Sequence, residues 1–318
     1  MQRRTLMASL LAAPASALAQ TFPARAIRVV VPFAAGGAAD SAARTIFPRM
    51  GERLGQPVVV ENRTGAGGSL GGGEVARAAS DGHTLLLDAG SHLVNPLLMR
   101  GLPFDYLTAF APISQVVVFP QVLAVKADLP VTTLAEFVTL ARSRPGGLSI
   151  GTQGNASPGH LGLAQLGLRA GIQLTHVPYR GGADAARDLA SGVLDGVFIT
   201  MLSAGPIVDS GRARFLAVAN AYRAVLRPHV PTMAEAGVAG VVIAEWAGLF
   251  APAATPPAAQ LAVFGALREA LAMTEVRERL AALAAEPVGS TPEAFGRFIR
   301  QGRDEAAVVV REANIRIE

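Results

Sequence analysis

The feature that most constrains this chain is a repeated pattern of a short β-branched segment, a glycine-containing turn and a helical segment. It is first seen at residues 26–33, whose run AIRVVVPF is typical of a buried strand. Gly36 and Gly37 follow, and then a helical pattern over residues 40–54. Parallel strands need a crossover to return to the same edge of a sheet, and a helix usually provides it. We therefore expect an α/β fold with a parallel sheet wrapped by helices.

The same pattern recurs along the rest of the chain. Further strands are predicted at residues 58–60, 84–87, 116–125, 148–151, 175–179, 197–200 and 214–219. Further helices are predicted at residues 74–79, 133–144, 160–170, 183–191, 258–273, 274–285 and 291–313. Pro48 should kink or shorten the first helix, and Pro120 should break the strand in which it lies.

Two such strand–helix halves, joined by short apolar connections, indicate two lobes with a cleft between them. The length of 318 residues also suits two domains rather than one. We expect lobe 1 to comprise residues 20–122 and 246–318, and lobe 2 to comprise residues 123–245. Ligands of open α/β sheets bind at the carboxyl ends of the strands, so the glycine turns are the first candidates for a site.

The first 19 residues have the features of a signal peptide. Arg3 and Arg4 precede an apolar run over residues 6–18, and small residues lie before a cleavage point after Ala19. The apolar run is too short for a transmembrane helix and is interrupted by Pro14. We therefore predict an exported protein.

Composition excludes several classes of function. The chain has no cysteine, which excludes disulfides, thiolate nucleophiles and cysteine-type zinc sites. Its net charge is only +4, and it has no run of basic residues, so nucleic-acid binding is not expected. The five histidines are scattered without a metal-binding spacing, and the motifs of nucleotide-binding loops and hydrolase elbows are missing. We expect no metal, no cofactor and no catalysis.

Several segments, in matching order and at matching spacing, resemble the Bug-type receptors, the solute-binding subunits of tripartite tricarboxylate transporters. They are VPFAAGGAAD at 31–40, LGQPVVVENR at 54–63, GAGG at 65–68, DGHTLL at 81–86, HVPYRG at 176–181, VPTMAEAG at 230–237, WAGL at 246–249 and EPVGSTP at 286–292. The resemblance extends over nearly all of the chain that follows the leader. It implies a type II periplasmic-binding-protein fold: two Rossmann-like lobes joined by hinge strands, with a ligand cleft between them.

The resemblance also implies a function. Such a receptor is a monomer in the periplasm that closes on a small carboxylate and delivers it to membrane permease subunits. Two alternatives stay open: a receptor that presents its ligand to a membrane sensor kinase, and an exported enzyme on the same fold. The segment over residues 197–203 has no carboxylate, which argues against an amino-acid ligand and for a less polar acid. Asp184 is an unusual neighbour for an anion and leaves the details of its turn open.

A carboxylate suits the start of a helix, where N–H groups have no helical partner and the helix dipole is positive. One such start follows Phe33–Gly37, and Gly181–Ala183 offers the same arrangement in the other lobe. By resemblance, these two units hold the ligand from both sides. Asp40 also suits a first-turn helix acid, Trp246 also suits core packing, and His160 is expected to orient the loop over residues 155–157. The predicted ligand-binding residues are Phe33, Ala35, Gly36, Gly37, Asp40, Gly90, Ser91, Asn155, Ala156, Ser157, Tyr179, Gly181, Gly182, Ala183, Thr200 and Trp246.

Overall fold

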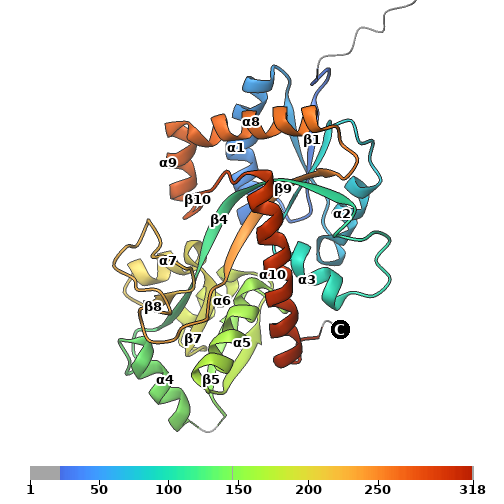
Figure 1. Ribbon diagram of the computed structural model, residues 1–318. Helices are drawn as coiled ribbons and strands as arrows, with labels where there is room; N and C mark the ends of the chain where they lie inside the picture. The colour runs from blue at the N-terminus through green and yellow to red at the C-terminus, as the bar shows by residue number, and fades with distance from the viewer. Residues whose placement is uncertain (1–21, 145, 317–318) are drawn as a thin grey trace, which may run out of the picture.

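The computed structural model describes residues 22–144 and 146–316. The predicted signal peptide, residues 1–19, lies outside these described residues. In the described part, strands and helices alternate and helices cover both faces of a mixed sheet (Figure 1). No helix in this part of the chain is long and apolar enough to cross a membrane.

The strands belong to one ten-stranded mixed sheet. They are β1 Ile27–Val31, β2 Val58–Asn62, β3 Thr84–Asp88, β4 Phe110–Lys126, β5 Leu148–Thr152, β6 Leu174–Pro178, β7 Gly196–Thr200, β8 Ala213–Val218, β9 Ala244–Pro252 and β10 Glu286–Pro287. The α-helices are α1 Ala38–Leu54, α2 Ser69–Ala76, α3 Ser91–Leu98, α4 Leu134–Ser143, α5 Pro158–Ala170, α6 Gly182–Ala190, α7 Met201–Asp209, α8 Pro257–Ala272, α9 Thr274–Ala282 and α10 Pro292–Glu312. A short 3₁₀ helix, Ala66–Gly68, precedes α2.

The long strand β4 joins the two halves of the sheet. The strand order is β2-β1-β3-β9-β4-β7-β5-β6, and β8 and β10 also pair with β4. Residues 110–120 of β4 pair with β9, and residues 121–125 pair with β7. Figure 1 shows β4 running from the half that contains α1 and α8 into the half that contains α4 to α7. The structure thus has the two-lobed α/β architecture that the sequence predicts.

The directions of the strands decide which loops face the other half. Strands β1 to β3 are parallel to one another, and β3 reaches β4 through two antiparallel pairings with β9, so β1 to β3 run in the direction of β4. Strand β7 is antiparallel to β4, and β5 and β6 are parallel to β7. The carboxyl ends of β1 to β3 therefore point toward the second half, and those of β5 to β7 point toward the first.

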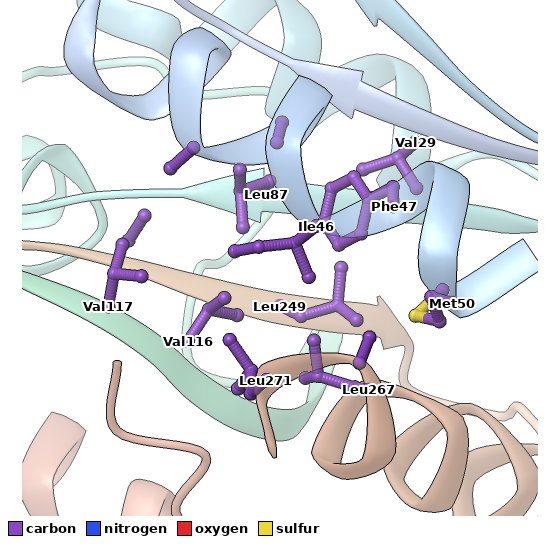
Figure 2. Close-up of a cluster of buried hydrophobic side chains, with 14 of the residues drawn as sticks. Val29, Ile46, Phe47, Met50, Leu87, Val116, Val117, Leu249, Leu267 and Leu271 are labelled. Carbon is purple, nitrogen blue, oxygen red and sulfur yellow. The ribbon is translucent and has the colours of Figure 1, made fainter. Parts of the chain in front are cut away.

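The first half is packed on both faces of its sheet because neighbouring side chains of a strand point to opposite sides. Val29 and Leu87 face α1 and α8, where they form the cluster shown in Figure 2 with Ile46 and Leu267. Val30, the neighbour of Val29, belongs instead to the cluster on the face covered by α2, α3 and α10. This two-sided packing makes the first half a firm base for the loops at the ends of its strands.

The second half has its own core. Phe198 of β7 packs on the side of α4 and α5, while its neighbours Val197 and Ile199 pack toward α6 and α7. The two halves also meet on the side of α10, where Ala156 and Leu161 share a cluster with Trp246 and other residues of the first half. Helix α10 packs against α3, β4 and α5, so it contacts both halves.

Pro48 does not shorten its helix, and the prediction that Pro120 breaks its strand is wrong. Pro48 lies inside α1, which runs unshortened over 17 residues. The neighbours Ile46 and Phe47 are fully buried, so tertiary packing outweighs the local cost of the proline. Pro120 lies inside β4, which does not break there. It lies where β4 changes its partner from β9 to β7, so its missing N–H interrupts neither ladder.

The helix predicted at residues 74–79 begins earlier, at Ser69, and ends at Ala76. Its glycines pack closely: a β-carbon at Gly71 would lie 2.9 Å from the carbonyl oxygen of Arg63, and one at Gly72 would lie 3.1 Å from Phe104 Cζ. Tertiary packing therefore overrides the low helix propensity of glycine. Helices α3 and α7 and strand β9 have no counterpart among the predicted elements. Both of these short helices contain a proline, and β9 lies in an apolar stretch without alternation.

A pair of glycine substitutions tests this packing. A β-carbon at Gly248 would overlap with the ring of Phe295 and lie 2.9 Å from Trp246 Cζ3, so Gly248→Ala should lower the free energy of unfolding by about 1–3 kcal/mol. Gly265 in α8 has open space around its α-carbon, so Gly265→Ala should be neutral or stabilise by up to about 1 kcal/mol. Urea unfolding of both variants measures the difference. Equal stabilities would contradict this packing.

Candidate functional site

The two predicted glycine turns follow β1 and β6, at strand ends that point toward the opposite half. The spacing between the two sets of ends can be read along β4. Asp88, the last residue of β3, pairs with Gly248 of β9, which in turn pairs with Gln115 of β4. Thr200, the last residue of β7, pairs with Gln121 of β4. Six residues of strand correspond to about 20 Å. The strand ends of the two halves therefore face each other over a short span along β4.

The first turn is held by the carboxylate of Asp40, which is only 1 % exposed. The N–H of Gly36 donates to Asp40 Oδ2 at 2.8 Å, and the N–H of Gly37 donates to the carbonyl of Ala34 at 3.1 Å. Asn62 Nδ2 donates both to Asp40 Oδ1 and to the carbonyl of Phe33. Gly36 has φ +79°, which a glycine adopts without strain. The glycines thus shape the turn, and their N–H groups are engaged within it.

Asp40 therefore serves the turn rather than facing outward. Burial by itself raises the pKa of its carboxyl, but hydrogen bonds from Arg44, from the Gly36 N–H and from Asn62 together hold that pKa below its usual value. The first helical hydrogen bond runs from the N–H of Ser41 to the carbonyl of Gly37 at 2.8 Å. The N–H groups of Ala38 and Ala39 precede it, so no carbonyl of α1 accepts from them. These amides are what the first turn offers to an anion.

The second turn has a similar start. Gly181 caps α6 with extended backbone, and its carbonyl accepts the first helical hydrogen bond, from the N–H of Ala185 at 3.5 Å. The N–H groups of Gly182 and Ala183 precede that bond and have no acceptor within the helix. The carboxylate of Asp184 pairs with Arg187 Nη2 at 2.8 Å, which reduces its repulsion of an anion nearby.

The loop between β3 and α3 brings the two halves into contact. A β-carbon at Gly90 would lie 3.3 Å from Pro158 Cγ, at the start of α5 in the other half. The hydroxyl of Ser91 donates to Asp88 Oδ1 at 2.7 Å, so it is used inside its own loop. A β-carbon at Gly68 would lie 3.5 Å from Ser91 Oγ and 3.4 Å from Pro32 Cβ, which places this loop beside the first turn.

The loop that contains Asn155, Ala156 and Ser157 is held by hydrogen bonds to Gly154 and His160. The N–H of Ala156 donates to His160 Nδ1 at 3.1 Å, and Ala156 has the strained value φ +55° for a residue with a side chain. Ser157 caps α5: its hydroxyl accepts from the N–H of His160 and donates to the carbonyl of Gly154. Asn155 is exposed. The expected orienting role of His160 is confirmed.

His160 can accept that hydrogen bond only while its Nδ1 is unprotonated. Its ring stacks on that of His176, with centroids 3.8 Å apart, and His176 Nε2 lies 2.7 Å from Thr152 Oγ1. Burial, with a smaller contribution from His176, lowers the pKa of His160 to about 4. Burial also lowers the pKa of His176. Both rings are therefore neutral at pH 7.

Three further predicted residues use their side chains within the fold. The hydroxyl of Tyr179 donates to Asp188 Oδ2 at 2.7 Å, and burial together with that bond raises its pKa to about 12. The hydroxyl of Thr200 caps α7 by accepting from the N–H of Ser203. Trp246 is 3 % exposed and makes edge contacts with aromatic rings of α10. Trp246 therefore packs in the core, and it lies on the α10 side of the sheet.

Most of the predicted residues fall into two groups, one in each half. In the first half, residues 33–40 lie beside Gly90 and Ser91. In the second half, residues 155–157, 179–183 and 200 are joined: a β-carbon at Gly154 would lie 3.3 Å from the carbonyl oxygen of Tyr179, and one at Gly182 would lie 2.5 Å from Ser203 Oγ. Trp246 lies on the α10 face, where it shares a buried cluster with Ala156 and lines a cavity together with Gly90 and Ala156.

Four supporting residues were not among the predicted set: Asn62, Asp88, His176 and Ser203. Asn62 and His176 lie within the segments that resemble the receptor family, but their roles depend on contacts across the sheet that a sequence pattern does not show. Within residues 22–144 and 146–316, no three histidine, aspartate or glutamate side chains gather as metal ligands would.

Comparison with known proteins finds a matching family model and proteins of similar sequence and structure. Residues 42–315 match the family model described as tripartite tricarboxylate transporter family receptor. Protein BugT of Bordetella pertussis is 36% identical over 310 residues, which are 97% of this chain and 94% of BugT. The structure of Rpa4515 of R. palustris with adipate is 33% identical at a TM-score of 0.81, covering 93% of this chain and 99% of that one. MatC (Rpa3494) of Rhodopseudomonas palustris with bound malate is 32% identical at a TM-score of 0.75, covering 91% and 100%.

Two neighbouring glycines of the second turn should respond differently to substitution. Gly182→Ala should lower the melting temperature, because its β-carbon would lie 2.5 Å from Ser203 Oγ and 2.8 Å from Ser203 Cβ. Gly181→Ala should leave the melting temperature unchanged, because nothing lies within 4 Å and the backbone there is extended. Differential scanning calorimetry compares the two. A destabilised Gly181→Ala variant would show that this turn is packed against protein rather than open.

The His160 contact predicts a loss of stability in acid. Because the folded pKa of about 4 lies below the ordinary 6.5, the unfolded chain binds more protons between these values. Stability from this site is therefore complete above pH 6.5 and declines as the pH falls toward 4. His160→Gln, whose amide oxygen can accept from the N–H of Ala156, should show a shallower decline in melting temperature between pH 7 and pH 4. Identical slopes for the two proteins would refute the assignment.

Proposed function

The chain belongs to the tripartite tricarboxylate transporter receptor family, and on that premise we propose that it captures a small carboxylate between its two halves for delivery to a membrane transporter. The observation that supports this best is the pair of helix starts, α1 and α6, which follow strand ends that face each other. Each offers N–H groups without a helical acceptor at the positive end of a helix dipole. The matching family is one of transporter receptors, not of enzymes.

The proposed ligand is a dicarboxylate of the size of malate or adipate. Two facing helix starts match two carboxylates, and the two similar structures hold such diacids. Most of the polar side chains around the turns are already engaged: Asp40, Ser91, Ser157 and Thr200 all bond within their own loops. Recognition by backbone amides therefore needs no arginine pointing at the ligand. A dianionic ligand also fits the absence of a carboxylate from residues 197–203, since an acidic side chain there would repel it.

Capture would proceed by bending at the strands that cross between the halves. We take lobe 1 as residues 20–122 and 246–318 and lobe 2 as residues 123–245, so β4 and the segment before Trp246 form the hinge. An open receptor binds the anion on one turn, and closure brings the other turn onto it. Export by the predicted signal peptide would place the protein in the periplasm, where it would act as a monomer and dock on permease subunits.

Thermal shift with a panel of acids tests the ligand class. Adipate or malate at a hundredfold excess over its Kd should stabilise the folded protein by about 2.7 kcal/mol, because it binds only that state. Adipamide, which has the same chain without charge, should have no effect. The proposal fails if no dicarboxylate in the panel raises the melting temperature while a neutral sugar does.

Gly181→Ala tests the site itself. Its β-carbon would point into the open space that we assign to the ligand, so the variant should bind the stabilising acid at least tenfold more weakly while folding normally. Gly192→Ala is unsuitable as a control because φ is +82° there, whereas Gly205→Ala in α7 has open space and ordinary helical backbone. Gly205→Ala should bind like the unmodified protein in titration calorimetry. Equal affinities for all three proteins would place the ligand elsewhere.

A further inference from the structure

A cavity of about 590 Å³ lies under α10, and none of the residues 33–37 and 179–183 contributes to its wall. Its wall comes from α3 and α10 in the first half, from α5 in the second half, and from residues beside β4, β8 and β9. Gly90 and Ala156, where the halves touch, form its edge toward the two turns. The cavity is therefore separate from the space that we assign to the carboxylate. In volume it is within the usual range for small-molecule sites, about 300–1,000 Å³.

The wall is mainly apolar and includes the buried ring of Trp246 and the half-buried ring of Phe298. Leu93, Leu161, Ile243, Trp246 and Phe298 line it. Trp246 and Phe298 meet edge to face, with ring centroids 5.3 Å apart. Such a wall favours a molecule with a flat ring, because apolar and aromatic contacts supply most of the binding free energy in sites of this kind.

The charges around the cavity oppose an anion. Glu305 is the one charged residue among those that line it, and it is exposed at the mouth, where it accepts a hydrogen bond from Gln301 Nε2 at 2.8 Å. No arginine, lysine or histidine is among the lining residues. A carboxylate that entered the cavity would lose its hydration and would find the negative charge of Glu305 there, with no positive charge to offset it. The chemistry of this cavity is thus opposite to that of the two turns.

One buried amide in the wall has no partner. Asn220, which follows β8, is 4 % exposed, and neither its Oδ1 nor its Nδ2 has a hydrogen-bond partner among the described residues. Gln165 Oε1 in α5, also in the wall, is buried and unpartnered in the same way. A buried polar group without a partner is unfavourable, so a ligand that supplies a donor and an acceptor here would be favoured.

We propose that this cavity is a second small-molecule site, for an uncharged and mainly apolar ring compound that has one amide or carbonyl group to pair with Asn220. The ring lies against Trp246 and Phe298, and the polar group faces the Asn220 amide. The site is distinct from the two turns: of the residues predicted to bind the carboxylate, Gly90, Ala156 and Trp246 line this cavity, and residues 33–37 and 179–183 do not.

Benzamide and benzoate are matched probes, since they share a ring and differ in charge. In titration calorimetry with the protein free of other ligands, benzamide should bind with a Kd at least tenfold lower than that of benzoate. Ala306→Phe places a ring into the cavity and should weaken benzamide at least tenfold. Val308→Phe, two positions along α10 and outside the wall, should leave the Kd unchanged. Benzoate binding as tightly as benzamide, or equal affinities in both variants, would overturn the proposal.

Asn220→Leu tests the polar contact and does not rely on filling the cavity. The variant should fold with an unchanged or raised melting temperature, because it removes a buried amide without partners. It should lose at least tenfold in benzamide affinity and keep its affinity for toluene. A large fall in melting temperature would show that Asn220 is satisfied within the fold and would refute the site. Stabilisation by adipate should persist in Asn220→Leu and Ala306→Phe, which separates this test from that of the carboxylate site.

Discussion

The direction of the strands relative to β4 is the constraint on which the rest of the structure depends. Because β1 to β3 run along β4 and β5 to β7 run against it, the loops at the carboxyl ends of these six strands are aimed at the opposite half. A parallel sheet alone would place such loops at one outer edge. Here the 17-residue strand β4 passes through both halves of one sheet. It is parallel to β1–β3 and antiparallel to β5–β7, so the helix starts that follow β1 and β6 face one another.

This arrangement explains why few charged side chains are needed at the candidate site. The positive potential comes from N–H groups of Ala38, Ala39, Gly182 and Ala183 at the starts of α1 and α6. The side chains nearby have a different task, which is to hold each turn in shape. Asp40 anchors the first turn through the N–H of Gly36, and the other capping hydroxyls and His160 do the same for their loops. The side chains therefore determine the geometry, and the backbone presents the charge.

Much of the fold could be predicted from the sequence, because β-branched runs and glycine turns have strong local preferences. The predicted strands at 26–33 and 84–87 correspond to β1 and β3, and the family resemblance implied the two lobes. Prediction was wrong where tertiary contacts override local preference. Pro48 is tolerated because α1 is packed on both sides of it, and α2 begins among glycines because only they fit against Arg63 and Phe104.

The candidate site shows the same limit. The position of the turns could be read from the glycines, but the glycines at 36 and 37 proved to shape the turn with their own N–H groups already engaged. Asn62, 22 positions away from Asp40 along the chain, donates to Asp40 Oδ1, and no spacing in the sequence shows this contact. The sequence leaves open whether Trp246 packs in the core or lines the cleft, and the structure places it on the α10 face, in edge contact with Phe295 and Phe298.

Backbone amide chemical shifts measured by NMR during titration with a dicarboxylate test the central claim most directly. If the anion is held between facing helix starts, the amide signals of Ala38, Ala39, Gly182 and Ala183 should shift together, with one common Kd and with the largest changes in the protein. Shifts confined to one half, or centred away from both turns, would contradict the account.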